Sequence, residues 1–437
     1  MTTALSPVPA TGPAATPAAD PAHTADTAPP TPTSIPDTAP TAPTAASAPA
    51  PDPAPAVDPA RAPGVGGPSL AAARPDRADA DPRRALDELA RWQDDGRAAD
   101  RFPYRAVLGH YRAVGKNAVG AELLTALRAV EPPRAKTADP AERLLADWLP
   151  QVVDGRDGDY DSYLGSPVYA SLAAAGAGAE QVITALLADV ATVEAATLAD
   201  APAGLARTRA ALRALTAAAG LPAGRGAPAE PAGLVRACAE AVAAARDTVP
   251  AGVLRAVELT LTPTTTSHDE QMFIRVIQIF EAVFAAVADA VRAATEAVAA
   301  GRTGVARELL AGAAGQVAGT SAVFRVLTTM PRDAFAVIRA NTDGRSAVQS
   351  RAYRAVERSC PELHRALLDS GLPQDELHPV MAELDDAWGA MKRTHWGITM
   401  KIIGMVRGTG GTAGASYLRE AAEARLFPDL DRDHQGG

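Results

Sequence analysis

The chain has 437 residues and a formal net charge of −9, with 42 Lys and Arg against 51 Asp and Glu. The basic residues form no cluster of five or more, so the electrostatic footprint of a nucleic-acid-binding protein is missing. Two cysteines, Cys238 and Cys360, are too few for a disulfide framework or a cysteine zinc site and are typical of a reduced cytosol.

Residues 1–80 are predicted to be a disordered leader. The segment consists mainly of Ala, Pro, Thr and Asp, as in PAPDPAPAVDPARAP, and offers too little apolar surface to offset the entropy of ordering. It has no basic segment followed by an apolar core, so we expect no signal peptide. No run of about 18 apolar residues is free of charge. We therefore expect a cytoplasmic protein without a membrane span.

From residue 81 onward, apolar residues recur at the three- and four-residue spacing of amphipathic helices, and strand-like alternation is scarce. Abundant alanine favours helix, and proline clusters separate the helical segments. The clearest early helices are RRALDELARW, AVGAELLTALRAV, EQVITALLADVATVEAA and GLARTRAALRALTAAAG. We predict an all-α helical bundle, with an N-terminal helical region over 81–255 and a helical core over 256–437.

A long helix is predicted over SHDEQMFIRVIQIFEAVFAAVADAVRAA, which begins at Ser267. Ser267 and Glu270 form the S-x-x-E pattern of a capping box, and Asp269 in the first turn suits the helix dipole. One apolar stripe follows at helical spacing: Met272, Phe273, Val276, Ile277, Phe280 and Phe284. A second long helix is predicted from about Arg302 to Pro331, where another helix starts.

The segment THWGITMKIIGMVRGTGGTAGASYL places a histidine on a helix that ends in a glycine-rich loop. Phosphate-binding loops precede their helix, whereas this loop follows one, so a nucleotide site is not indicated. His395 is followed on the same helix by Ile398, Ile402 and Ile403. A lone histidine in such a setting is more often a core or surface residue. It is also what a five-coordinate haem requires as its proximal ligand.

Four segments, in the same order, resemble the tryptophan 2,3-dioxygenase family of haem enzymes. SHDEQMFI with IFEAVF is similar to the family's His-Asp-Glu-x-Leu-Phe-Ile helix, and VLTTMPRDAFAVIR resembles its Thr-Met-x-Pro stretch ending in Phe-Arg. VQSRAYRAVE is similar to its Phe-Gln-Ser-x-x-Tyr-Arg-x-x-Glu stretch, and the histidine segment with its loop, followed by FPDL, resembles its haem-ligand helix and ending. The resemblance covers 267–430. Upstream, YDSYLGSPVY resembles an early Tyr-x-x-Tyr-Leu element, and an additional helical stretch intervenes.

This resemblance implies haem b, with its iron, as the cofactor, and a small aromatic amino acid and O2 as the substrates. His395 matches the proximal haem histidine, and Arg339 matches the arginine that binds the substrate carboxylate through two parallel donors. Phe273 matches the aromatic residue that packs against the indole. Thr409 matches the loop threonine that contacts the amino-acid end of the substrate, and Gly408 is assigned to the cofactor side of this loop.

Several positions depart from the family pattern. Ile277 stands where bacterial and animal tryptophan dioxygenases carry a distal histidine that bonds the indole nitrogen, and isoleucine offers neither donor nor acceptor. Phe335 replaces a tyrosine in the substrate pocket, and Phe324 replaces a tryptophan near the haem. Met391 replaces a tryptophan before the ligand helix. The predicted pocket is thus more apolar than is usual, with no certain catalytic side chain; related indoleamine dioxygenases work without the histidine.

We expect a haem-dependent dioxygenase that adds O2 across the indole C2–C3 bond of tryptophan or a substituted tryptophan, giving an N-formylkynurenine-type product. The altered distal position leaves open a haem-dependent monooxygenase of a modified tryptophan or tyrosine. A third possibility is a non-catalytic haem-binding protein, against which the retention of Arg339 and the GTGG loop argues. By analogy with the family we expect a homo-oligomer, either a dimer or a tetramer.

Overall fold

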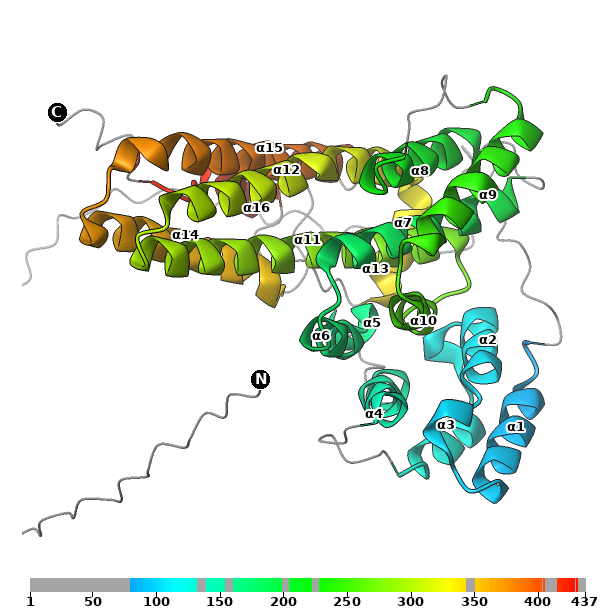
Figure 1. Ribbon diagram of the computed structural model, residues 1–437. Helices are drawn as coiled ribbons and strands as arrows, with labels where there is room; N and C mark the ends of the chain where they lie inside the picture. Colours follow the sequence, from blue (N-terminus) through cyan, green and yellow to red (C-terminus); the bar gives the residue numbers. More distant parts are fainter. Residues whose placement is uncertain are drawn as a thin grey trace, which may run out of the picture. The chain divides into compact units, whose positions relative to one another are not determined.

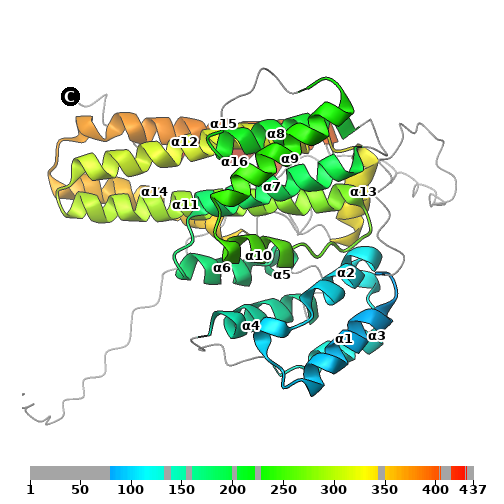
Figure 2. The same cartoon turned by 45° about the vertical axis from the view of Figure 1, so that its right-hand side comes forward.

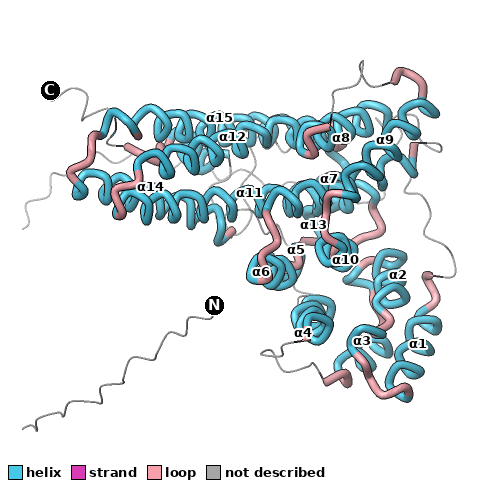
Figure 3. Tube along the Cα trace, viewed as in Figure 1, coloured by secondary structure: helices cyan, strands magenta, loops and turns pink. Residues whose placement is uncertain are grey.

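The computed structural model describes residues 79–131, 139–153, 160–198, 204–221, 228–342, 350–402, 404, 415–428 and 430. In these ranges all regular elements are helices and no strand occurs (Figure 3). The all-α prediction is therefore confirmed. Residues 1–78 of the predicted leader lie outside the described residues, so its disorder stays a prediction. None of the described helices is long and apolar enough to cross a membrane.

Four helices of the described chain, each 20 residues or longer, form the main bundle (Figure 1). They are α11 (His268–Ala299), α12 (Thr303–Leu327), α14 (Arg351–Ser370) and α15 (His378–Ile402). Helix α11 packs against α12 and α14, and α12 packs against α15. The short α13 (Arg332–Asn341) follows α12 and contacts α11, while α16 (Ala415–Glu423) packs on α15. The predicted break between two helices at Pro331 is confirmed.

Three helices from the additional stretch pack on one end of this bundle (Figure 2). Helix α7 (Ala179–Thr197) contacts α11, α8 (Leu205–Ala218) contacts α12, and α9 (Pro231–Asp247) contacts both α7 and α8. They share one apolar core with the bundle, and this core runs in sequence from Val182 to Leu430. The additional stretch is thus built into the bundle core.

The remaining described helices surround a second and a third apolar cluster. The second is formed mainly by the first four helices, and the third contains Tyr160, Tyr163 and Ile274. These helices are α1 (Pro82–Asp94), α2 (Tyr104–Val114), α3 (Ala121–Arg128), α4 (Pro140–Val153), α5 (Tyr160–Leu164), α6 (Ser166–Ala174) and α10 (Ala251–Leu259), with short 3-10 helices at Ala99–Arg101 and Lys116–Ala118. A third 3-10 helix, Gln374–Glu376, lies between α14 and α15 and contacts α15. The main core contains residues from both sides of the predicted boundary between 81–255 and 256–437. The boundary therefore does not separate two cores, and the division into these two regions stays a prediction.

Helix α11 begins as predicted, with Ser267 as the N-cap residue, but the predicted capping box is wrong. The Ser267 side chain makes no capping hydrogen bond. The Glu270 carboxylate, fully buried, instead accepts hydrogen bonds from the backbone N–H of Thr264 at 2.8 Å and of Thr265 at 2.7 Å. Both threonine hydroxyls and the Tyr163 hydroxyl also donate to it. Five donors compensate the desolvation of this carboxylate, so Glu270 fixes the loop that leads into α11.

Candidate functional site

Helix α11 presents a stripe of large apolar side chains that the protein covers only in part. Phe273, Ile277 and Phe280 recur at intervals of four and three residues, so they lie on one face of the helix. All three are half-buried, whereas Phe284, the next residue of the stripe, is 6% exposed. The first half of α11 therefore keeps some accessible apolar surface on this face.

His395 lies on α15, half-buried, with its ring close to parallel to that of Phe324. The ring centroids are 6.4 Å apart and the planes differ by 23°. Burial lowers the pKa of the imidazole below its ordinary value of 6.5. The ring is therefore neutral at pH 7, which is the form in which histidine binds a metal.

Phe324 connects His395 to the stripe on α11. It is 4% exposed, and its ring centroid lies 4.7 Å from that of Phe280. Three helices thus contribute one ring each to a continuous series: His395 from α15, Phe324 from α12 and Phe280 from α11. The structure therefore brings together His395 and Phe324, two of the three residues that the sequence assigned to the cofactor, and places them beside α11.

Helix α13 adds a second group at the start of the stripe. The Phe335 ring meets the Phe273 ring edge to face, with centroids 5.5 Å apart and planes at 75°. Arg339 follows Phe335 by four residues, so both side chains leave the same face of α13. Both are half-buried. Helix α13 thus carries the predicted carboxylate-binding residue on the face that it turns toward α11.

The predicted residues accordingly fall into two groups that both touch the α11 stripe. One group consists of Phe273, Phe335 and Arg339, and the other consists of Phe324 and His395, while Ile277 lies between Phe273 and Phe280 along α11. Gly408 and Thr409, with the rest of the GTGGTAG loop, lie outside the described residues, so their assigned roles stay predictions.

Sequence reasoning missed a polar cluster one turn after Ile277. The Glu281 carboxylate accepts hydrogen bonds from the Tyr160 hydroxyl at 2.7 Å and from the Ser350 hydroxyl at 3.0 Å. Burial raises the pKa of Glu281 above its usual 4.5. Tyr160 comes from YDSYLG and Ser350 from VQSRAYR, so three of the segments that resemble the family meet at this carboxyl group. The only sign of this cluster in the sequence was that all three segments resemble the same family.

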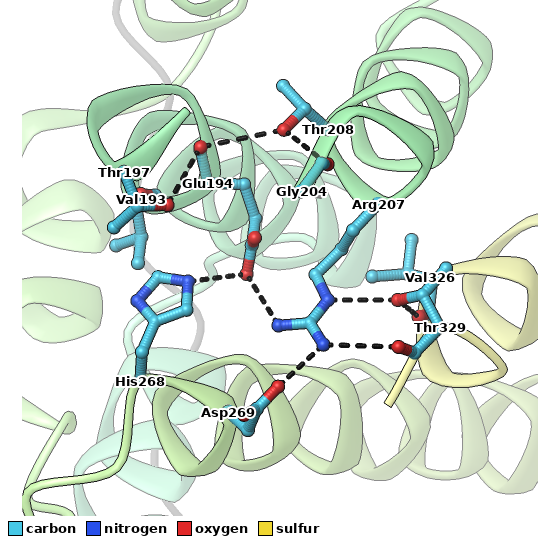
Figure 4. A network of polar contacts seen from close by, with 10 residues as sticks. All are labelled: Val193, Glu194, Thr197, Gly204, Arg207, Thr208, His268, Asp269, Val326 and Thr329. Carbon is cyan, nitrogen blue, oxygen red and sulfur yellow. Dashed lines mark hydrogen bonds and ion pairs between the residues drawn. The ribbon is translucent and has the colours of Figure 1, made fainter. Parts of the chain in front are cut away.

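A buried ionic cluster at the start of α11 was also missed (Figure 4). Arg207 of α8 is 1% exposed, and its Nη2 donates to Oδ1 of Asp269 at 2.5 Å. Its Nη1 lies 3.6 Å from Oε1 of Glu194 on α7, and Nε2 of His268 lies 3.1 Å from the same oxygen. Buried charges are tolerated only when they are well paired, so the cluster fixes α7 and α8 against α11. Two of its contacts, Arg207 with Asp269 and His268 with Glu194, join residues 62 and 74 positions apart, beyond the reach of local patterns.

The chemistry of the described residues around His395 is compatible with an axial haem ligand. A haem with one protein ligand requires a neutral imidazole beside apolar surface, and His395 with Phe324 and Phe280 supplies both. Among the described side chains, no three His, Cys, Asp or Glu come together in a way that could hold a metal ion.

Comparison with known proteins points to the same family as the motifs. A tryptophan 2,3-dioxygenase of Bordetella pertussis is 40% identical over 57 residues, which are 13% of this chain and 20% of that relative. One of Bradyrhizobium diazoefficiens is 36% identical over 81 residues, 18% of this chain and 26% of the relative, and one of Ruegeria pomeroyi is 40% identical over 55 residues, 13% and 20%.

These similarities are short. The chain matches only between 20% and 26% of the length of these curated relatives, and no family model matches it. Over this part of its length, the chain is similar to tryptophan 2,3-dioxygenases.

Proposed function

We propose that the protein is a haem-dependent dioxygenase that adds O2 across the indole C2–C3 bond of tryptophan or a substituted tryptophan, with an N-formylkynurenine-type product. The observation that carries the proposal is the neutral, half-buried His395 facing Phe324, which joins it to the partly covered stripe on α11. The partial similarity to tryptophan 2,3-dioxygenases supports the choice of reaction and substrate.

In this proposal haem b is held by His395 through its iron, with Phe324 and Gly408 on the cofactor's periphery. When bound, the haem supplies the redox-active iron needed for chemistry with O2. Helix α15 fixes the imidazole on a long, well-packed helix, and the neutral state of the ring leaves a nitrogen lone pair for the metal.

The substrate is held at both ends by side chains of this chain. Arg339 binds the carboxylate through two parallel N–H donors, and Thr409 binds the amino-acid end. Phe273 and Phe335, already in edge-to-face contact, pack against the aromatic ring. Holding the substrate at both ends orders the reactants before the reaction, which is a large source of rate enhancement.

Ile277 makes the centre of the pocket apolar and water-excluding. It offers no acceptor to an indole N–H, and an unpaired N–H in a dry pocket costs about 1–3 kcal/mol of binding. The reaction in this proposal requires no side-chain base at that position. A second candidate function follows from the same residue: a haem-dependent monooxygenase that inserts one oxygen atom into a modified tryptophan or a tyrosine.

The proposal is tested by supplying the purified, haem-loaded protein with reductant, O2 and aromatic amino acids. Turnover of tryptophan or a methylated tryptophan with a gain of two oxygen atoms supports the dioxygenase. A gain of one oxygen atom supports the monooxygenase instead. Failure to bind haem would reject both. We also propose, by analogy, a cytoplasmic location and a dimeric or tetrameric assembly. Light scattering of the purified protein tests the assembly.

A further inference from the structure

Helix α13 buries few of its own side chains. Of its ten residues, Ile338 is the one that is fully buried, and its neighbours Ala336 and Val337 are exposed. Besides the ring contact between Phe335 and Phe273, the carbonyl oxygen of Asn341 at the end of α13 accepts a hydrogen bond from the Asn117 side chain at 3.3 Å. With one fully buried residue, we expect the position of this helix to depend on how its N-terminal end is anchored.

That anchor is provided by Arg207 of α8. The chain enters α13 through the turn that follows α12, and Thr329 lies in this turn. Nε of Arg207 donates to the Thr329 hydroxyl at 2.9 Å, and Nη2 lies 3.3 Å from the Thr329 carbonyl oxygen (Figure 4). The guanidinium is thus shared between the turn before α13 and the carboxylates of Glu194 and Asp269.

The same guanidinium also fixes the partner of α13 on α11. Asp269, which accepts from Arg207, stands in the first turn of α11, and Phe273 follows it by four residues on the same helix face. Phe335 stands in the first turn of α13. Arg207 therefore joins, through its planar fork of donors, the two chain segments that carry the aromatic pair.

We propose that Arg207 is a positioning residue: it locks the turn before α13 to the start of α11 and thereby orients Phe335 and Arg339 over the aromatic site. Arg207 belongs to the additional helical stretch between Tyr169 and Ser267. The role that we assign to this stretch is therefore to hold α13 and the start of α11 in position from outside the site. The effect on the substrate rests on the proposed function above; the effect on α13 does not.

The test uses variants of the full chain that remove the lock in different ways. Arg207→Lys keeps the charge but loses the fork of donors. A triple variant with Arg207→Met, Glu194→Gln and Asp269→Asn removes the charges together, so that no unpaired charge is left buried and the fold is retained. Thr329→Val removes the hydroxyl that accepts from Arg207 and donates to the Val326 carbonyl oxygen, whereas Thr329→Ser keeps a hydroxyl there. Leu215→Ala on α8, fully buried and remote from the cluster, is the matched control for general destabilisation of α8.

The first measurement is amide hydrogen exchange of the haem-free protein. We expect exchange in α13 to rise about tenfold or more in Arg207→Lys and in the triple variant, less in Thr329→Val, and not in Thr329→Ser. In Leu215→Ala we expect faster exchange in α8 with α13 unchanged. Wild-type protection of α13 in both Arg207 variants would overturn the proposal.

The second measurement is steady-state kinetics of the haem-loaded protein with the amino acid that it oxidises. We expect the Arg207 variants to raise KM about tenfold, with kcat changed less than about threefold and haem content unchanged. Loosened α13 with a wild-type KM would also overturn the assignment of Arg207 to the site. If the wild type neither binds haem nor oxidises any aromatic amino acid, the proposed function fails, and hydrogen exchange alone decides whether Arg207 positions α13.

Discussion

Ile277 gives a prediction that separates this protein from a dioxygenase with a polar distal residue. Its neighbours along the α11 stripe, Phe273 and Phe280, are also apolar, and the nearest carboxylate on the helix, Glu281, is engaged by the Tyr160 and Ser350 hydroxyls. Neither Ile277 nor its two apolar neighbours on this helix face offers an acceptor to an indole N–H. Methylating that nitrogen removes a group whose desolvation costs about 1–3 kcal/mol. We expect the wild type to accept 1-methyltryptophan with a KM no higher than that for tryptophan.

The variant Ile277→His should reverse this preference. A net hydrogen bond contributes about 0.5–1.5 kcal/mol, which corresponds to an advantage of about two- to twelvefold for tryptophan over 1-methyltryptophan. The assay is KM and kcat for both compounds in the wild type, in Ile277→His and in the control Ile277→Leu, which should behave like the wild type. A wild type that prefers tryptophan by tenfold or more would refute the reasoning, because another acceptor must then meet the N–H.

Three further predictions concern the ligand, the carboxylate and a buried acid. His395→Ala should abolish the Soret band of the reconstituted protein, and an unchanged haem content would reject the ligand assignment. Arg339→Ala should leave the haem intact and raise KM for the amino acid about tenfold to a hundredfold, because a charged hydrogen-bonded partner is lost; a wild-type KM would contradict the role. Glu281 has a raised pKa in the folded state, so the folded protein binds its proton more tightly than the unfolded chain does. Stability should therefore fall as pH rises from about 4.5 through the folded pKa, and urea midpoints of Glu281→Gln should lack this slope; equal slopes in both proteins would argue against the shift.

The helices of the main bundle could be predicted from the sequence because their signals are local. The apolar spacing after Ser267 and the proline at Pro331 mark the start of α11 and the break before α13, and both appear in the structure. The prediction of a capping box at Ser267 was wrong for a reason that residue spacing does not reveal. The Glu270 side chain is long enough to reach back past Ser267, and the Thr264 and Thr265 donors compete for it successfully.

The candidate site could be predicted only through the motifs. Spacing alone did not distinguish His395 from the other six histidines. Its ring contact is with Phe324, 71 residues earlier in the sequence, and no local pattern encodes a contact over that separation. The cluster around Arg207 was out of reach for the same reason, since it is assembled from three helices and a turn. The roles of Gly408 and Thr409 rest on the motif alone.

The activity proposed for this chain is haem-dependent dioxygenation of tryptophan or a substituted tryptophan. Its most direct test is the mass of the product that the reduced, haem-loaded wild type forms from L-tryptophan and methylated tryptophans under isotopically labelled O2. We predict a product that carries both atoms of one O2 molecule, and no such product from His395→Ala. A product with one labelled oxygen atom, or no turnover of any of these compounds by a haem-replete protein, would contradict the account.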